Sequence, residues 1–277
     1  MGHLTMQTVD AKGAKIPIVG LGTWELRGRD CVRVVDQAIK LGYRHFDTAQ
    51  LYGNEREVGE GVRASGIRRE EIFVVTKVAP ENLAPRQLER SVKDSIGQLR
   101  LGEIDLLLLH WPNKGVPLAD TLAALCKVKK EGLARHIGVS NYTVALLDEA
   151  NRLTSEPLVC NQFECHPFLD QSKVLAATRR HGMAAIAYSP IARGGARRDD
   201  TLAHIGRAHG KTAAQVSLRF LVQQDIAVIP RTSKIERLTE NIALFDFELS
   251  DAEMSEIAAL AHPGGRIVDW AWSPKWD

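Results

Sequence analysis

The sequence predicts an α/β fold, and within that class a closed (β/α)8 barrel that spans residues 1–277 as a single domain. Eight short apolar runs are each followed by a polar turn and an amphipathic stretch of helical period. The apolar runs are almost wholly hydrophobic, as expected of parallel strands buried on both faces. No linker or change of composition interrupts the series, which favours a closed barrel over an open sheet.

The repeated units follow one another in a regular order. The predicted strands lie in 18–24, 43–49, 71–78, 103–112, 134–141, 158–164, 183–190 and 226–233. The helices that follow them are 30–42, 54–66, 84–101, 117–132, 143–153, 171–182, the pair 199–210 and 212–224, and 235–245. Glycine stands where several helices should end, at Gly42, Gly66, Gly132, Gly182 and Gly210.

Two segments lie outside the repeat. Residues 7–18 contain a Lys-Gly turn between two short apolar stretches, which predicts a β-hairpin plug across the bottom of the barrel. Residues 262–277 are polar and rich in tryptophan, and we expect them to form a tail over the active-site face. This tail contains Trp270, Trp272 and Trp276.

Composition excludes several classes of protein. With 36 basic and 34 acidic residues the formal charge is +2, which argues against nucleic-acid or membrane-surface binding through bulk charge. No apolar run is long enough to span a bilayer. Four cysteines are too few for a disulfide scaffold, so we expect reduced, buried thiols and a cytoplasmic location. Their spacing does not complete a four-ligand zinc set, and no metal is predicted.

Polar side chains stand where the second, third and fourth predicted strands end. Asp47, Lys77 and His110 come directly after apolar runs, and Tyr52 lies in the loop that follows Asp47. Active sites of (β/α)8 barrels form at the carboxyl ends of the strands. We therefore expect these four side chains to share one rim and to be partly withdrawn from water.

Together the four residues suit protonation of an oxygen atom. Lys77 and Asp47 can form a buried ion pair, and a lysine cation beside Tyr52 is expected to lower the pKa of its phenol and make it a usable acid. Neutral His110 can donate a hydrogen bond to a substrate carbonyl. No residue of the set supplies a nucleophile for the carbonyl carbon, and a hydride from a nicotinamide would fill that role.

Other interpretations of the same residues remain open. Taken singly, Asp47 could cap a turn, Tyr52 could pack with a hydrated hydroxyl, and His110 could be structural. A lysine in a barrel strand can form a Schiff base, so Lys77 could instead belong to an aldolase. A nucleotide-sensing accessory subunit without turnover is a third possibility.

Two segments are candidates for binding a nucleotide. The stretch GEGVRA at 59–64 matches a dinucleotide fingerprint formally, but it lies inside a helical pattern with no strand before it. The eighth strand is followed by IPRTSKIER, which places three basic side chains near a helix N-terminus, where phosphate binds readily. A solvated basic turn is the simpler alternative. So positive a cluster favours NADPH over NADH.

At this point the chain resembles the aldo-keto reductases along nearly its whole length. The matching stretches, in the expected order, are GLGTW, GYRHFDTAQLYGNEREVG, LLLLHWP, IGVSNY, NQFECHP, AYSP and IPRTSKIERLTEN. The resemblance implies a TIM barrel, NADPH-dependent reduction of aldehydes and ketones, and a catalytic tetrad at Asp47, Tyr52, Lys77 and His110. The small bacterial members that reduce methylglyoxal and 2,5-diketo-D-gluconate are the most similar, and a monomer is expected.

The resemblance also implies contacts with cofactor and substrate. The cofactor, NADPH or NADP+, would be held by Thr23, Asp47, Ser140, Asn141, Gln162, Tyr188, Ser189, Pro190, Ile191, Arg231, Thr232, Ser233, Lys234, Arg237, Glu240 and Asn241. The substrate would contact Trp24, Tyr52, His110 and Trp111. Many relatives have lysine where Arg231 stands; the charge is kept, although the two side chains are not interchangeable.

Overall fold

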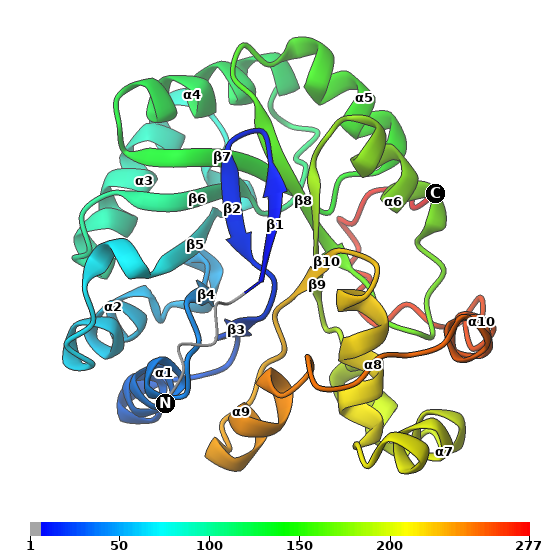
Figure 1. Ribbon diagram of the computed structural model, residues 1–277. Helices are drawn as coiled ribbons and strands as arrows, with labels where there is room; N and C mark the ends of the chain where they lie inside the picture. Colours follow the sequence, from blue (N-terminus) through cyan, green and yellow to red (C-terminus); the bar gives the residue numbers. More distant parts are fainter. Residues whose placement is uncertain (1–6) are drawn as a thin grey trace.

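The computed structural model describes residues 7–277, in which ten helices surround an eight-stranded parallel barrel (Figure 1). The barrel strands are β3 (Gly20–Gly22), β4 (His45–Asp47), β5 (Phe73–Val78), β6 (Ile104–Leu109), β7 (Ala134–Ser140), β8 (Leu158–Glu164), β9 (Ala184–Tyr188) and β10 (Ile226–Val228). Neighbours in sequence are neighbours in the sheet throughout. The predicted fold class is therefore confirmed.

The helices lie outside the strands and follow them in the predicted order. They are α1 (Gly28–Lys40), α2 (Glu55–Ala64), α3 (Pro85–Leu99), α4 (Leu118–Lys130), α5 (Val144–Leu153), α6 (Ser172–Arg180), α7 (Asp200–His209), α8 (Ala213–Val222), α9 (Ile235–Ile242) and α10 (Asp251–Ala258). In α1 the buried residues Cys31, Val34, Val35, Ala38 and Ile39 recur at helical spacing, which gives the helix one apolar face for the barrel.

The first and last barrel strands are shorter than their apolar runs and close the barrel through isolated bridges. Val19 pairs with Val228, and Gly22 pairs with Arg231. A Cβ atom on Gly22 would lie 2.6 Å from the carbonyl oxygen of Ile229, so only glycine permits this approach. Closure brings the loop after β10 beside the loop after β3, and both loops contribute to the site described below.

The predicted plug is a hairpin of β1 (Thr8–Ala11) and β2 (Ala14–Pro17) (Figure 1). Lys12 and Gly13 form its turn, both with positive φ. His45, the first residue of β4, places its Nδ1 2.9 Å from the carbonyl oxygen of Pro17. The hairpin therefore covers the end of the barrel at which the strands begin, opposite the rim at which they end.

The glycines of GEGVRA serve helix packing. A Cβ atom on Gly59 would lie 1.9 Å from the carbonyl oxygen of Leu99 at the end of α3, and one on Gly61 would lie 2.7 Å from the Val35 side chain in α1. Both glycines lie within α2, away from any strand end. Close helix contacts account for them, and the match lacks the strand-to-helix turn that a dinucleotide fingerprint requires.

Candidate active site

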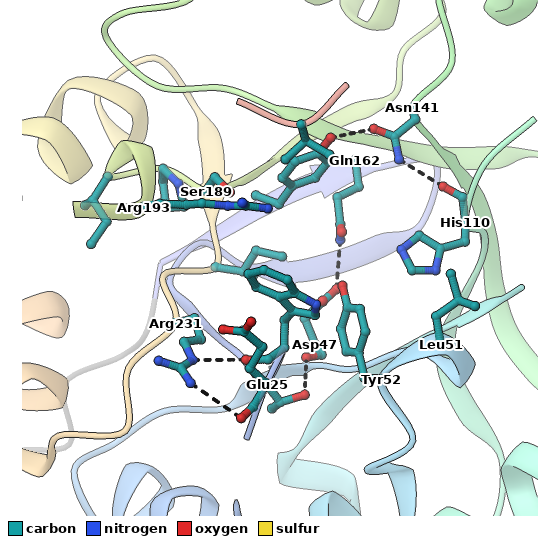
Figure 2. Close-up of a pocket in the computed structure, with 18 of the residues that line it drawn as sticks. Glu25, Asp47, Leu51, Tyr52, His110, Asn141, Gln162, Ser189, Arg193 and Arg231 are labelled. Carbon is teal, nitrogen blue, oxygen red and sulfur yellow. Dashed lines mark hydrogen bonds between the residues drawn. The ribbon is translucent and has the colours of Figure 1, made fainter. Parts of the chain in front are cut away.

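Three neighbouring strands bring Asp47, Lys77 and His110 to the same rim of the barrel. Asp47 ends β4, Lys77 is the penultimate residue of β5, and His110 follows β6 directly. Parallel pairing of these strands aligns their carboxyl ends. Tyr52 ends the short 3₁₀ helix η1 (Gln50–Tyr52) in the loop after β4. Figure 2 shows Asp47, Tyr52 and His110 around a single cavity.

A buried ion pair lies at the base of the site. Lys77 Nζ is 2.5 Å from Asp47 Oδ1, and the two side chains are 0% and 2% exposed. The ammonium also donates to the carbonyl oxygen of Thr48 at 2.9 Å and to Tyr52 Oη at 3.3 Å, while Gln162 donates to the second Asp47 oxygen at 2.8 Å. Burial is the largest influence on the pKa of Lys77 and by itself would lower it, but Asp47 and Tyr52 together outweigh burial and raise that pKa. Lys77 therefore stays protonated, and with all its hydrogens engaged it is a poor Schiff-base nucleophile.

The pKa of Tyr52 differs from the sequence-based expectation. Burial raises the pKa of its phenol above the ordinary value of 10.0, and the Lys77 ammonium opposes this rise without reversing it. The expectation of a pKa below the ordinary value was therefore wrong for the protein alone. Lys77 limits the rise of the Tyr52 pKa that burial causes, because its positive charge would stabilise the phenolate left after proton donation.

His110 is held as a neutral imidazole. Burial, and then the nearby Lys77 charge, lower its pKa well below the usual 6.5. Its ring meets the Tyr52 ring edge to face, with the centroids 5.7 Å apart. Its carbonyl oxygen accepts a hydrogen bond of 3.0 Å from the Asn141 side chain. The neutral imidazole packs against Tyr52 and has one N–H available as a donor, while its Nδ1 is buried without a hydrogen-bond partner among residues 7–277.

These groups open into a cavity of about 480 Å³. The predicted site residues that line it are Thr23, Trp24, Asp47, Tyr52, His110, Trp111, Asn141, Gln162, Tyr188, Ser189, Pro190, Ile191, Arg231 and Arg237. They come from the loops of widely separated units, so the barrel itself brings them together. Trp24 is 38% exposed and Trp111 only 5%.

The remaining predicted residues lie behind or beside the cavity wall. Ser140, Thr232 and Asn241 are buried, whereas Ser233 and Lys234 are exposed. Glu240 is held by Arg197 at 2.9 Å and by the Thr212 hydroxyl at 2.6 Å. The side-chain oxygen of Asn241 is buried and has no hydrogen-bond partner within residues 7–277.

Sequence reasoning did not select several residues of the lining. They are Gly22, Glu25, Leu51, Arg193, Gly194, Arg197, Ile229 and Val268. Trp270 and Trp272, which also line the cavity, belong to the tail that was expected over this face. The guanidinium of Arg193 lies 4.7 Å from the centre of the Trp24 ring, so the loop after β9 reaches across to the loop after β3. The available signal was IARGGARR, a glycine pair flanked by arginines immediately after the seventh predicted strand.

Two strand ends carry strained backbone at the cavity. Asn141 after β7 and Ser189 after β9 have φ of 62° and 50°, in the left-handed region that non-glycine residues seldom adopt. The Tyr188 hydroxyl donates to the Asn141 side-chain oxygen at 2.8 Å, which ties the two positions together. Such strain persists where surrounding contacts over-determine it, and it clusters at ligand sites.

One end of the cavity suits an anionic group. Arg231 bonds only to main-chain oxygens, donating to Trp24 at 3.0 Å and to Glu25 at 3.5 Å. Within the described part of the chain, no carboxylate pairs with Arg231, Lys234 or Arg237. Figure 2 places Arg231 and Arg193 on the side of the cavity away from His110. The residues present therefore fit a phosphate-bearing dinucleotide that extends from this basic end toward Tyr52.

Comparison with known proteins agrees with this geometry. Residues 18–262 match the model of the Aldo/keto reductase family. The chain belongs to that family, and it is a carbonyl-reducing enzyme of the NAD(P)H-dependent class. Residues 7–277 contain no cluster of His, Cys, Asp and Glu that could hold a metal ion, and no helix among them could cross a membrane.

Individual members of the family are similar to this chain over nearly its whole length. Methylglyoxal reductase DkgB of Escherichia coli O157:H7 is 37% identical over 265 residues, covering 95% of this chain and 99% of the relative. Glyoxal reductase of Bacillus subtilis is 38% identical and covers 90% of each chain. A crystal structure assigned as a 2,5-diketo-D-gluconic acid reductase B is 47% identical with a TM-score of 0.97, covering 99% of this chain and 98% of the other.

Proposed function

We propose that this enzyme reduces small aldehydes and ketones with NADPH and that Tyr52 is the general acid. The observation that carries the proposal is the hydrogen-bonded series Asp47–Lys77–Tyr52 at the base of a cavity whose other end is basic. The names of the relatives support small dicarbonyls such as methylglyoxal, or keto sugar acids such as 2,5-diketo-D-gluconate, as substrates.

Each residue of the tetrad has a separate role in the proposed reaction. His110 donates a hydrogen bond to the substrate carbonyl oxygen and orients it toward Tyr52. Tyr52 Oη gives its proton to that oxygen, and the Lys77 ammonium stabilises the phenolate that remains. Asp47 keeps Lys77 charged and in place. When bound, the nicotinamide of the cofactor supplies the hydride.

We propose that the cofactor occupies this cavity with the contacts that the family resemblance implies. Asn141 and Gln162 would hold the nicotinamide amide, and Tyr188 would stack on its ring. The backbone from Ser189 to Ile191 would follow the pyrophosphate. The basic end, with Arg231, Arg237, Thr232, Ser233 and Lys234, would bind the adenosine 2′-phosphate, since guanidinium groups bind phosphate in bidentate fashion. The unpartnered amide oxygen of Asn241 suits the amino group of adenine.

A kinetic comparison tests the acid. We expect Tyr52→Phe to lower kcat for methylglyoxal at least 100-fold, because general acids contribute about 10²–10⁴, while the Kd for NADPH changes little. Absorbance at 340 nm gives turnover, and quenching of protein fluorescence gives binding. Full activity in the variant would remove Tyr52 from its role. Tight NADPH binding by the unaltered enzyme, with no turnover over a wide carbonyl panel, would instead support an accessory subunit.

We further propose a single domain, a monomer in solution and a cytoplasmic location. The four cysteines are buried and unpaired, which suits a reducing compartment. Sedimentation velocity should give one species near the chain mass of 30.6 kDa.

A further inference from the structure

Asn54 lies two residues after Tyr52, at the N-cap position of α2. An asparagine at this position ordinarily caps the helix, because its side-chain oxygen accepts from a backbone N–H of the first turn. The Asn54 side chain makes no such bond, although it is 0% exposed. Its polar atoms are therefore used elsewhere, and capping of α2 does not account for them.

The side chain of Asn54 joins the loops that follow β3 and β4. Its Oδ1 accepts a hydrogen bond of 2.7 Å from the Thr48 hydroxyl. Its Nδ2 donates to the carbonyl oxygens of Thr23 at 2.8 Å and Leu26 at 3.0 Å. An amide has two donor hydrogens and one acceptor oxygen, so every polar group of the side chain has a partner. Three buried hydrogen bonds thus fix the chain close to the proposed acid.

The bond to Thr48 connects Asn54 to the strand that carries Lys77. The Thr48 carbonyl oxygen accepts from Lys77 Nζ at 2.9 Å, and the Thr48 backbone N–H donates to the carbonyl oxygen of Val75 at 2.9 Å. Tyr52 Oη lies 3.3 Å from the same ammonium, which makes it the most distant of the three acceptors of Lys77. Because hydrogen bonds weaken beyond about 3.2 Å, a small displacement of Tyr52 would break this contact.

The short helix η1 that carries Tyr52 is fixed at both ends. At its start, the Gln50 side-chain oxygen accepts from the backbone N–H of Ala79 at 2.9 Å. Beyond its end, Asn54 provides the buried bonds described above. Arg27 also donates to the Tyr52 carbonyl oxygen, but the Arg27 side chain is exposed. Asn54 therefore supplies the buried restraint on the side of η1 that faces the loop after β3.

The two bonds that Asn54 donates hold the loop 23–26, on which Arg231 rests. The Trp24 and Glu25 carbonyl oxygens of this loop accept from the Arg231 guanidinium at 3.0 and 3.5 Å (Figure 2). Glu25 has a φ of 61°, in the left-handed region that non-glycine residues seldom adopt. Such a conformation persists only where the surrounding contacts over-determine it. Asn54 makes two of these contacts.

We propose that Asn54 is a positioning residue that holds Tyr52 beside Lys77 and, through the same amide, holds the loop that supports Arg231. The inference rests on the proposed function, in which Tyr52 is the acid. Proton donation needs a phenol placed within hydrogen-bond reach of the substrate oxygen, and a displacement of about 1 Å can lower a rate about 10²-fold. One side chain thus sets the geometry at the inner end and at the basic end of the cavity.

Single-turnover kinetics with the full chain test the first contact. The enzyme is mixed with NADPH and then with excess methylglyoxal, and absorbance at 340 nm gives a rate constant and an amplitude. We expect Asn54→Ala to lower the rate constant about 10- to 100-fold and to leave the amplitude unchanged, because the folded enzyme remains competent but Tyr52 is misplaced. A reduced amplitude with a wild-type rate constant would mean a structural role alone and would overturn the proposal.

Thr48→Val removes one of the three bonds and serves if Asn54→Ala does not fold. It keeps the size of the side chain and the carbonyl oxygen that Lys77 contacts. The rate constant should fall about two- to tenfold, as for one neutral hydrogen bond, and Thr48→Ser should keep the wild-type value. Thr178→Val is the matched control, because it removes a buried hydroxyl bond of 2.8 Å to the Val174 carbonyl oxygen in α6. Equal rate constants for Thr48→Val and this control would overturn the positioning of Tyr52.

Cofactor binding tests the second contact of Asn54. We expect Asn54→Ala to raise the Kd for NADPH about three- to tenfold, since the loop under Arg231 loses two hydrogen bonds. Thr48→Val should leave this Kd unchanged, because its hydroxyl contacts Asn54 and not the loop 23–26. Quenching of protein fluorescence measures both values. A wild-type Kd in Asn54→Ala would overturn the support of Arg231.

Failure of the proposed function gives a different result. If the enzyme reduces no carbonyl, or if Tyr52→Phe keeps the full rate, the proposed function fails. Hydrogen exchange at the backbone amides of Tyr52 and Gly53 does not depend on turnover, and it then decides the inference. Faster exchange at these amides in Asn54→Ala than in wild type supports the positioning of Tyr52, whereas identical exchange rates overturn it.

Discussion

The inner and outer parts of the cavity differ in how deeply their polar side chains are buried and in whether their charges are paired. At the inner end, Asp47, Lys77 and His110 lie at the carboxyl ends of consecutive strands and are at most 7% exposed. Asp47 and Lys77 form an ion pair of 2.5 Å. At the outer end, Arg193, Arg231 and Trp272 come from loops and are exposed. The inner charges are paired within the protein, whereas Arg193 and Arg231 at the outer end have no carboxylate partner among residues 7–277.

This difference suits the inner groups to the reaction and the outer groups to ligand binding. Groups buried in a low-dielectric site interact strongly and need no rearrangement during reaction. Groups on loops interact weakly with the protein and are free to bind a ligand. A change at the inner end should therefore affect both folding and kcat, and a change at the outer end should affect binding alone.

Breaking the buried ion pair should have the largest effect. We expect Lys77→Met to reduce the free energy of unfolding by about 3–5 kcal/mol, because the Asp47 charge is left buried without a cationic partner. It should also lower kcat by about 10² or more. Urea denaturation and NADPH consumption measure the two effects. The double variant Asp47→Asn/Lys77→Met should be less destabilised, and a single variant as stable as wild type would contradict the contrast.

The outer basic end should respond in binding only. We expect Arg231→Ala to raise the Kd for NADPH about 10- to 100-fold, since a charged hydrogen bond contributes about 1.5–3 kcal/mol. The Kd for NADH and the unfolding free energy should change little. Arg198→Ala is the matched control, an exposed arginine outside the cavity lining. Equal, salt-insensitive use of both cofactors by wild type would remove the 2′-phosphate assignment.

The neutral His110 gives the inner end a pH dependence. Its pKa is lowered in the folded chain, so below the ordinary 6.5 the unfolded chain binds a proton that the folded chain does not. Stability should therefore fall with decreasing pH until the lowered pKa is reached, at up to about 1.4 kcal/mol per pH unit. Denaturation of wild type and His110→Asn between pH 8 and about pH 5 isolates this slope. Identical slopes would show that His110 does not contribute.

The contact between Arg193 and Trp24 should give the smallest effect. A cation–π contact at an exposed site contributes about 0.5–1 kcal/mol. We expect Arg193→Ala to speed NADPH dissociation about two- to fivefold, measured by stopped-flow fluorescence, with no change in kcat/KM for the carbonyl. A double-mutant cycle with Trp24→Leu separates this contact from any bond that Arg193 makes to the cofactor. Additive effects would mean that the two side chains act independently.

The inner end was largely predictable from the sequence, and the reason is local. A polar residue that directly follows an apolar run marks the carboxyl end of a strand, and a series of eight such runs predicts a barrel that gathers these ends. Asp47, Tyr52, Lys77 and His110 could therefore be selected before any contact was known. The direction of the Tyr52 pKa was missed because it depends on how much apolar surface surrounds the ring, which sequence spacing does not encode.

Thus the sequence by itself determined the barrel and the order of its units, and it was enough to select the candidate catalytic side chains, since each depends on patterns within a few residues. Only the tertiary structure decided how the outer end is closed. Arg193 over Trp24, Arg231 on the Trp24 carbonyl and Glu164 beneath Ile267 and Val268 join positions about 100 to 200 residues apart. Such contacts arise from barrel closure and tail docking, so no local pattern could reveal them.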